Sequence, residues 1–299
     1  MSHEGGPAGT KARETDAGAH RRPRRPRRIL RLSTFPTLLT MGNLVVGVLA
    51  IAYLADAHAL YVTGQSAGAA DLVTRAGWMI MLGMVFDALD GRVARLTRTT
   101  TEFGGALDSL ADVVTFGVAP AFVGKVLIED TLGSAEMKLS FLAAAFYAAC
   151  AALRLARYNA EHEEPDQAVS NFKGLPSPGA AGVLAGLAVA HQPVLEVLSL
   201  GEVGRAVTAH GIRFALLLGL GLLMVSRVPY LHVANRFLAG RKPVGRVALI
   251  LLLIALLLML PPEAVLAIAF LGYALSGPLM VLPRLVRGRR ADVVPELFD

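Results

Sequence analysis

The sequence predicts an all-α protein, a polytopic bundle of membrane-spanning helices, and two observations support this fold class. Hydrophobic residues make up 54% of the 299 residues and charged residues 17%, with a mean hydropathy of +0.54, which is more apolar material than one soluble core needs. Most of the apolar runs also approach the ~20 residues that a helix needs to cross a bilayer, and short polar links separate them. Spans are expected near residues 37–55, 77–95, 105–125, 139–158, 178–197, 211–230, 246–260 and 263–283.

Lysine and arginine are distributed unevenly between the links. With a cytoplasmic N-terminus, 24 of the 29 fall on the cytoplasmic side. The other side receives five, Arg75, Lys125, Lys138, Arg205 and Arg213. Because one missing or extra span would invert every later link, this split supports the span count. We therefore expect a multi-pass protein of the cytoplasmic membrane with both termini in the cytoplasm.

The basic charge indicates a lipid surface rather than nucleic acid. The net charge is +6 and the pI is about 9.8, but the basic residues lie beside apolar segments without interleaved aromatic residues. Residues 1–33, which include RRPRRPRR, have no apolar periodicity and are expected to form a disordered cytoplasmic arm. Anionic lipid headgroups are the expected partners. The single cysteine, Cys150, lies in an apolar run and excludes an internal disulfide.

Four aspartates stand where two apolar spans meet a short polar link, LTRTTTEF. They are Asp87, Asp90, Asp108 and Asp112. On a helix the first two share a stripe with Gly91 and Ala94, and the last two lie one turn apart on the next helix. Two acidic faces can therefore converge across a hairpin. Any one aspartate near a span end can simply cap a helix or face water, but four at this spacing favour a functional site.

Such a carboxylate group needs a counterion. Four adjacent carboxylates repel one another unless a cation neutralises them, and all-oxygen ligation suits Mg²⁺ or Mn²⁺. Gly91 and Gly104 leave open backbone beside the acids, where a phosphate or sugar can approach closely. Arg95, one turn after Gly91, is placed to pair with an aspartate or a phosphate oxygen.

The same residues carry a family resemblance. The stretch matches at every position the signature D-x2-D-G-x2-A-R-x8-G-x3-D-x3-D and resembles the CDP-alcohol phosphotransferases. Members of that family are integral membrane enzymes with a six-helix core, which use divalent metal ions to displace CMP from a CDP-linked alcohol by a second alcohol. The resemblance implies the following roles: Asp87, Asp90 and Asp108 as metal ligands, Asp112 as both metal contact and general base, and Gly91, Ala94, Arg95 and Gly104 as the lining of the cytidine-diphosphate pocket.

Segments outside the signature bear on the acceptor alcohol. Within the family, the sequences FPTLLTMGNLVVGVLAI, ALRLARYN, FKGLPSPGAA and LMVSRVPY resemble CDP-diacylglycerol–serine O-phosphatidyltransferases. The resemblance implies CDP-diacylglycerol and L-serine as substrates, phosphatidylserine and CMP as products, and a homodimer. It covers residues 34–232 and implies a six-helix catalytic membrane domain there. The two additional transmembrane helices expected over 233–285 depart from the shortest members and look like an extension, and a cytoplasmic tail is expected over 286–299. A direct attack and a phosphatidyl-enzyme intermediate both stay open.

A pocket for serine or phosphate is expected near the cytoplasmic ends of the fourth and fifth spans. Its candidate residues are Arg154, Arg157, Asn159, Lys173 and Ser177. For the two arginines, simple anchoring at the membrane surface is an equal alternative. Arg227 is interpreted as a snorkelling arginine, and His162, Glu163, Glu164 and Asp166 as a solvated loop rather than a second metal site.

Two other functions compete with this one. A sibling enzyme would transfer the phosphatidyl group to glycerol 3-phosphate, inositol or an inositol phosphate, and such acceptors demand a denser cationic pocket. A non-enzymatic transporter or scaffold would use the acids as an ion path. That reading explains membrane aspartates but not their fixed spacing to Gly91, Arg95 and Gly104.

Overall fold

The computed structural model describes residues 34–97, 101–129, 137–162, 174–190, 202–228, 230 and 261–286, all of them in one compact unit, Ser33–Asp299. Every regular element in these ranges is a helix. The helices are α1 (Thr34–Val62), α2 (Ser66–Thr97), α3 (Glu102–Asp112), η1 (Val113–Val118), α4 (Ala119–Glu129), α5 (Met137–His162), α6 (Ser177–Val189), α8 (Glu202–Val225) and α11 (Pro262–Val286).

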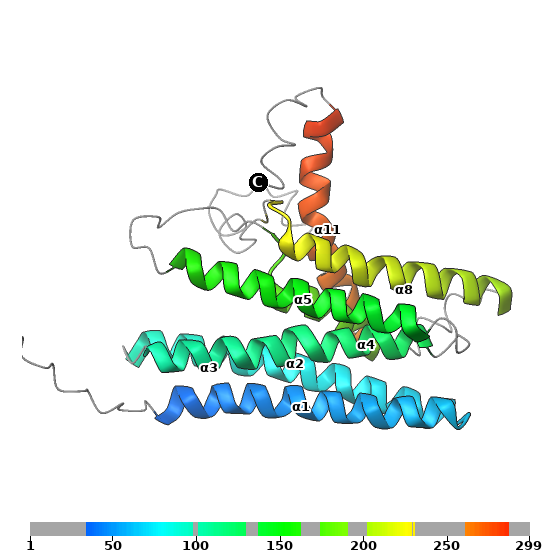
Figure 1. Cartoon of the computed structure of the whole chain (residues 1–299), viewed down its shortest axis with the longest axis horizontal. Coiled ribbons are helices and arrows are strands. Elements are labelled where there is room, and N and C mark those ends of the chain that lie inside the picture. Colours follow the sequence, from blue (N-terminus) through cyan, green and yellow to red (C-terminus); the bar gives the residue numbers. More distant parts are fainter. Residues whose placement is uncertain are drawn as a thin grey trace, which may run out of the picture. The chain divides into compact units, whose positions relative to one another are not determined.

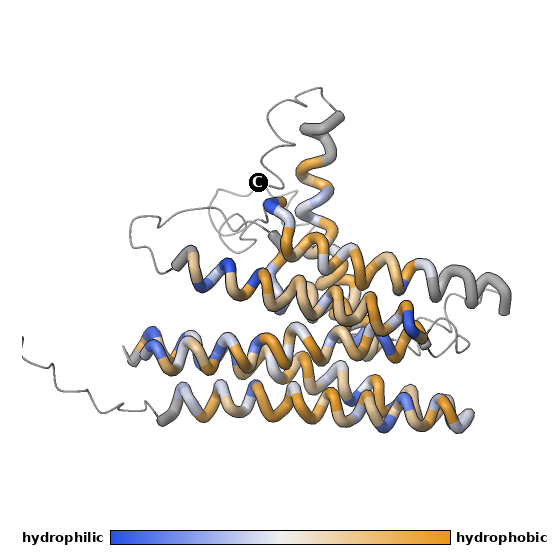
Figure 2. The backbone as a smooth tube through the Cα atoms, in the orientation of Figure 1, coloured by the Kyte–Doolittle hydropathy of each residue, from blue (hydrophilic) through white to orange (hydrophobic). Residues whose placement is uncertain are grey.

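The expected class, a polytopic helical membrane protein, is confirmed. Within the described residues, helical stretches long and apolar enough to cross a membrane are Pro36–Val62, Ser66–Leu96, Glu102–Ile128, Met137–Ala160 and Pro262–Val281. Two further apolar helices are shorter, Ser177–Val189 and Gly211–Val225. Long hydrophobic stretches run along the helices in Figure 2. The expected span over 246–260 lies outside the described residues.

The first two helices form a closer hairpin than the apolar runs indicated. The expected link over 56–76 is almost wholly helical, and only Thr63, Gly64 and Gln65 separate α1 from α2. Its alanine-rich sequence contains good helix formers, which extend both helices beyond their most apolar parts. Gly64 has a φ of 77°, and the amide of Gln65 donates to the carbonyl of Leu60 at 2.9 Å, a helix ending that favours glycine.

The third span contains a feature that apolar periodicity did not indicate. α3 and α4 continue through η1, a wider turn of π-helix that begins directly after Asp112. A π turn inserts one residue and leaves backbone groups for other partners. The hydroxyl of Tyr147 on α5 donates to the carbonyl of Phe116 in this turn at 3.4 Å.

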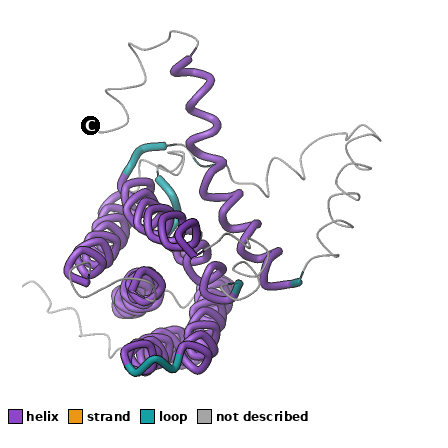
Figure 3. Tube along the Cα trace, turned by 90° about the vertical axis from the view of Figure 1, so that its right-hand side faces the viewer, coloured by secondary structure: helices purple, strands orange, loops and turns teal. Residues whose placement is uncertain are grey.

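Small residues let the helices pack closely. This is expected in a membrane, because lipid tails are as apolar as the helix surfaces and helix association therefore depends on close packing. α1 packs along α2, α5 lies between α4 and α8, and α6 contacts both α2 and α11. Figure 1 shows α1, α2, α3, α4, α5 and α8 with their axes in roughly the same direction, and Figure 3 shows several of the helices end-on as a bundle. Against α11, Gly179 meets Tyr273, Gly182 meets Phe270 and Gly186 meets Ala267. These glycines leave space that the α11 side chains fill.

Candidate functional site

Three of the four aspartates form one carboxylate cluster. Asp87 and Asp90 lie near the C-terminal end of α2, and Asp108 lies on α3 across the hairpin. One carboxylate oxygen from each lies within 4.8 Å of the others, close enough for a shared metal ion. Asp90 is buried and the other two are half-buried. The expected convergence of two acidic faces is therefore observed, and the cluster could hold a metal ion.

Helix α1 contacts two of the acids. The hydroxyl of Thr40 donates to Oδ2 of Asp90 at 2.9 Å, and the Asn43 amide nitrogen donates to Oδ1 of Asp112 at 3.1 Å. Asp112 is buried one turn after Asp108 and does not belong to the three-carboxylate cluster. Asp112 thus lies beside the cluster with a hydrogen-bond partner of its own.

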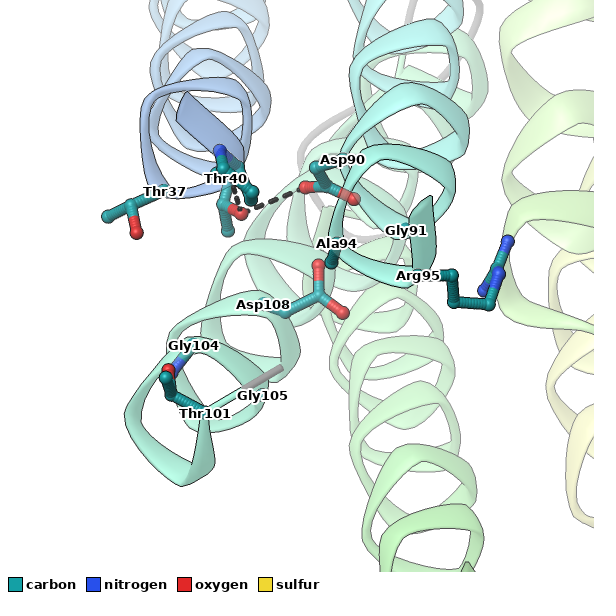
Figure 4. A pocket seen from close by; sticks show the side chains of 11 residues that line it. Thr37, Thr40, Asp90, Gly91, Ala94, Arg95, Thr101, Gly104, Gly105 and Asp108 are labelled. Carbon is teal, nitrogen blue, oxygen red and sulfur yellow. Dashed lines mark hydrogen bonds between the residues drawn. The ribbon is translucent and has the colours of Figure 1, made fainter. Parts of the chain in front are cut away.

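A cavity of about 210 Å³ opens next to the cluster. It is lined by Pro36, Thr37, Thr40, Asp90, Gly91, Ala94, Arg95, Thr101, Gly104, Gly105 and Asp108. All four residues expected to line the cytidine-diphosphate pocket are among them. In Figure 4 the carboxylates of Asp90 and Asp108 approach each other from α2 and α3, whereas the side chain of Arg95 points away from both. The pairing of Arg95 with an aspartate that the spacing allowed is not seen here.

The start of α3 is ordered by its own cap. Thr101 adopts an extended conformation, and its hydroxyl accepts a hydrogen bond from the amide of Gly104 at 3.0 Å. This cap fixes the turn that brings Gly104 and Gly105 to the cavity wall.

The described residues expected to form a serine pocket have different hydrogen-bond partners. Arg154 donates to the hydroxyl of Ser177 at 2.7 Å, and the Nε of Arg154 is buried and has no hydrogen-bond partner in the part of the chain that the structure describes. By contrast, Arg157 donates to the carbonyl of Val225 at the end of α8. Asn159 donates to the hydroxyl of Ser109, next to Asp108.

The structure describes only some of the other residues that the sequence placed near this pocket. Lys173 and residues 163–166 lie outside the described residues, as does the side chain of His162. Arg227 is half-buried after the end of α8. Pro176 and Pro178 flank Ser177 at the start of α6.

Thr40 and Asn43 are the site residues that the sequence did not reveal. They lie three residues apart in an otherwise apolar run, which places two polar groups on one face of a spanning helix. That spacing is the one feature of the sequence that could have indicated these two residues. The partners of these residues are 50 and 69 positions away, so only the folded hairpin brings them together.

The family model for CDP-alcohol phosphatidyltransferases matches residues 33–216, more than half of the chain. The chain belongs to this family. The match includes every residue of the carboxylate cluster, Asp112 and the lining of the cavity. The family assignment expected from the aspartate signature is confirmed.

Several curated proteins are similar to the chain, and three of them are each named CDP-diacylglycerol–serine O-phosphatidyltransferase. The Methanocaldococcus jannaschii protein is 31% identical over 208 residues, 70% of this chain and 79% of that relative. The Bacillus subtilis protein is 31% identical over 201 residues, 67% of this chain and 92% of that relative. The protein from Helicobacter pylori strain ATCC 700392 is 35% identical over 150 residues, 50% of this chain, so the match spans only 55% of that relative.

Proposed function

We propose that the protein transfers the phosphatidyl group of CDP-diacylglycerol to the hydroxyl of L-serine, releasing phosphatidylserine and CMP. The observation that carries this proposal is the cluster of Asp87, Asp90 and Asp108 beside a cavity whose lining includes the signature residues Gly91, Ala94, Arg95 and Gly104. The names of the relatives support serine as the acceptor.

The donor set fits a hard divalent cation. All three clustered side chains offer carboxylate oxygens, the ligand type that Mg²⁺ and Mn²⁺ prefer. Oδ1 of Asp108 is buried and has no hydrogen-bond partner within the described ranges, as expected of an atom reserved for a ligand. We propose that Asp87, Asp90 and Asp108 hold the ion and that Asp112 also contacts it. Bound Mg²⁺ or Mn²⁺ would neutralise the pyrophosphate and polarise the phosphoryl group that carries diacylglycerol.

Asp112 is proposed as the general base. As the serine oxygen bonds to the phosphorus, Asp112 takes the hydroxyl proton, and the bond from that phosphorus to the bridging oxygen breaks. The electron pair of the broken bond leaves on the CMP phosphate. Because Asp112 is buried, water has little access to compete with serine. The small residues Gly91 and Ala94 let the diphosphate approach the α2 backbone.

The acceptor pocket is proposed to centre on Arg154 and Ser177. Arg154 has a buried Nε without a partner, and guanidinium groups bind carboxylates with paired N–H donors. This arginine is therefore a candidate for the serine carboxylate or a lipid phosphate. Arg157 and Asn159, which bond elsewhere, are weaker candidates.

The wider setting is proposed from the sequence. The catalytic membrane domain spans 34–232, two further transmembrane helices span 233–285, and both termini and the site face the cytoplasm. The 24 cytoplasmic lysines and arginines support this orientation. We also propose a homodimer, which size measurement of the purified protein in detergent can test.

The test is CMP release by purified protein supplied with CDP-diacylglycerol and Mn²⁺ or Mg²⁺. Serine, glycerol 3-phosphate and inositol are offered separately. We expect release with serine, complete loss with EDTA, and a fall of at least about 100-fold in Asp112→Asn, in the range that general-base catalysis contributes. Asp71→Asn is the matched control, because Asp71 is an exposed aspartate on the same α2 that pairs with Arg75.

Each other outcome has a distinct meaning. Release with a different acceptor keeps the chemistry and rejects serine. No release with any acceptor, from protein that is folded and monodisperse, rejects phosphatidyl transfer and favours the ion-path function.

A further inference from the structure

We propose that α1 is a positioning helix for the acids, in which Asn43 sets the orientation of the Asp112 carboxylate and Thr40 that of Asp90. This inference rests on the proposed function for the role of Asp112. The two hydrogen bonds from α1 are observed independently of that function. Two donors, one turn apart on α1, reach two different carboxylates across the bundle. One acid belongs to the cluster and the other does not, so the two donors should have separable effects.

Asn43 is held from both sides. Its side chain is fully buried, and its amide nitrogen donates to Oδ1 of Asp112. Its backbone carbonyl accepts a hydrogen bond from the hydroxyl of Thr115 at 3.0 Å. Thr115 lies in η1, which follows Asp112 directly. One residue of α1 is thus tied to the acid and to the wide turn behind it.

The packing around Asn43 requires two glycines. A Cβ on Gly83 of α2 would lie 2.9 Å from Oδ1 of Asn43 and 2.5 Å from Cγ2 of Thr115. A Cβ on Gly47 of α1 would collide with the side chain of Thr115 and lie 3.0 Å from its Cα. Three helices therefore meet around this hydrogen bond at a distance that larger residues would prevent.

The asparagine at this position is explained by its contact with Asp112 rather than by apolar packing. The Oδ1 of Asn43 is buried and has no hydrogen-bond partner among the described residues, and an unpaired polar atom in an apolar interior is destabilising. An apolar residue would avoid that penalty but would leave the buried carboxylate of Asp112 without this donor. What asparagine provides is the N–H that engages one oxygen of Asp112 and fixes its rotamer. The other oxygen is then presented in one orientation, as a proton acceptor requires.

Thr40 provides the comparison within the same helix. It donates to Asp90, which shares the three-carboxylate cluster. Groups that orient metal ligands change metal affinity or activity by roughly 10–100-fold when they are removed. Loss of the Thr40 hydroxyl should therefore weaken metal binding, whereas loss of the Asn43 amide, which bonds an acid outside the three-carboxylate cluster, should act mainly on turnover and less on metal affinity.

The experiment compares Asn43→Leu and Thr40→Val with Thr74→Val, which removes a hydroxyl from α2 that bonds only to the carbonyls of Ala70 and Ala188. Mn²⁺ affinity is measured by titrating purified protein in detergent and following the Mn²⁺ electron paramagnetic resonance signal. CMP release is measured with serine, or with whichever acceptor the wild-type protein uses. CDP-diacylglycerol KM is measured in parallel.

We expect kcat to fall about 10–100-fold in Asn43→Leu, while Mn²⁺ affinity falls less than it does in Thr40→Val and KM changes less than about twofold. Thr40→Val should weaken Mn²⁺ binding about tenfold, and Thr74→Val should match the wild type. An unchanged kcat in Asn43→Leu overturns the role of Asn43. A loss of Mn²⁺ affinity in Asn43→Leu as large as that in Thr40→Val also overturns the separate roles.

Two further arms keep the test decisive. If Asn43→Leu is not monodisperse, Asn43→Ala carries the same expectation, since it removes the amide without adding bulk. If the wild type releases CMP only with another acceptor, serine is rejected while the Asn43 prediction is still tested. If it releases none, the Thr40 arm still tests Asp90 through Mn²⁺ affinity, and the Asn43 role falls with the reaction.

Discussion

Thr115 shows how much the site depends on single atoms. It is fully buried, its hydroxyl bonds to Asn43, and its methyl group lies against Gly83. Its neighbours on α1 and α2 are glycines because a Cβ at either place would come closer than nonbonded atoms ordinarily do. The orientation of Asp112 is thus linked through Thr115 to the spacing of three helices.

We expect Gly83→Ala to lower both stability and turnover. The added methyl group must displace Thr115 or Asn43, and overpacking of this kind costs about 1–3 kcal/mol of unfolding free energy. Thermal unfolding in detergent and CMP release check the two effects. Gly219→Ala is the matched control, because no described atom beyond its chain neighbours and its own helix backbone lies within 4 Å of its added Cβ. Equal behaviour of the two variants would contradict this packing account.

The sequence predicted the acids but not the residues that hold them. Asp87 and Asp90 share one helical stripe, and Asp108 follows after a short link, so local spacing was enough to bring them together. Asn43 and Thr40 act across 50 or more positions, and their polarity alone could not name a partner. The same limit applies to Arg154, whose bond to Ser177 depends on how α6 docks.

At the scale of elements, the apolar runs located the helices but misjudged where they begin and end. α1 reaches Val62 and α2 begins at Ser66, because helix formation continues through alanine-rich polar sequence beyond the most apolar core. The turn η1 left no sign in the hydrophobic pattern, since it follows from packing against α1 and α5. The short α6 was expected to run to 197, but its described helix ends at Val189.

The contact between α6 and α11 gives a prediction for the C-terminal helix, which lies beyond the family match. Gly182→Ala should lower the thermal unfolding temperature by several degrees, because its methyl group would collide with the ring of Phe270. Gly272→Ala on α11 is the control, since within 4 Å its Cβ would meet no atom of the described residues other than its chain neighbours and its own helix backbone. Adding Phe270→Ala to Gly182→Ala should remove the collision, so the two losses should not add. Simple additivity would show that the two residues do not touch.

For the whole molecule, the charge asymmetry predicts which helix ends face the cytoplasm. Gln65, in the turn between α1 and α2, and Glu102, at the start of α3, are both exposed and lie at opposite ends of α2. We expect a membrane-impermeant maleimide to label Gln65→Cys only from outside and Glu102→Cys only from the cytoplasmic side. Right-side-out and inverted vesicles distinguish the two.

The unsubstituted protein serves as the blank in that experiment, because Cys150 is 4% exposed and should react slowly. Labelling of both positions from the same side would contradict the spanning of α2. A reversed labelling pattern would show that α2 crosses the membrane, but in the direction opposite to that inferred from lysine and arginine.

The wide turn η1 also changes the direction in which the helix faces point before and after it. An α-helix rotates by roughly 100° per residue, so the inserted residue sets the faces of α3 and α4 out of step. α3 can therefore direct its acids toward α1 and α2, while Gly117 meets Ala151 of α5 and Gly124 meets Leu217 of α8. Deleting one residue between 113 and 118 would restore a regular helix, and no single rotation could then satisfy both halves. A surface loop readily absorbs the loss of one residue. In this span, the same loss would prevent the acids of α3 from facing α1 and α2 while the following half of the span packs against α5 and α8.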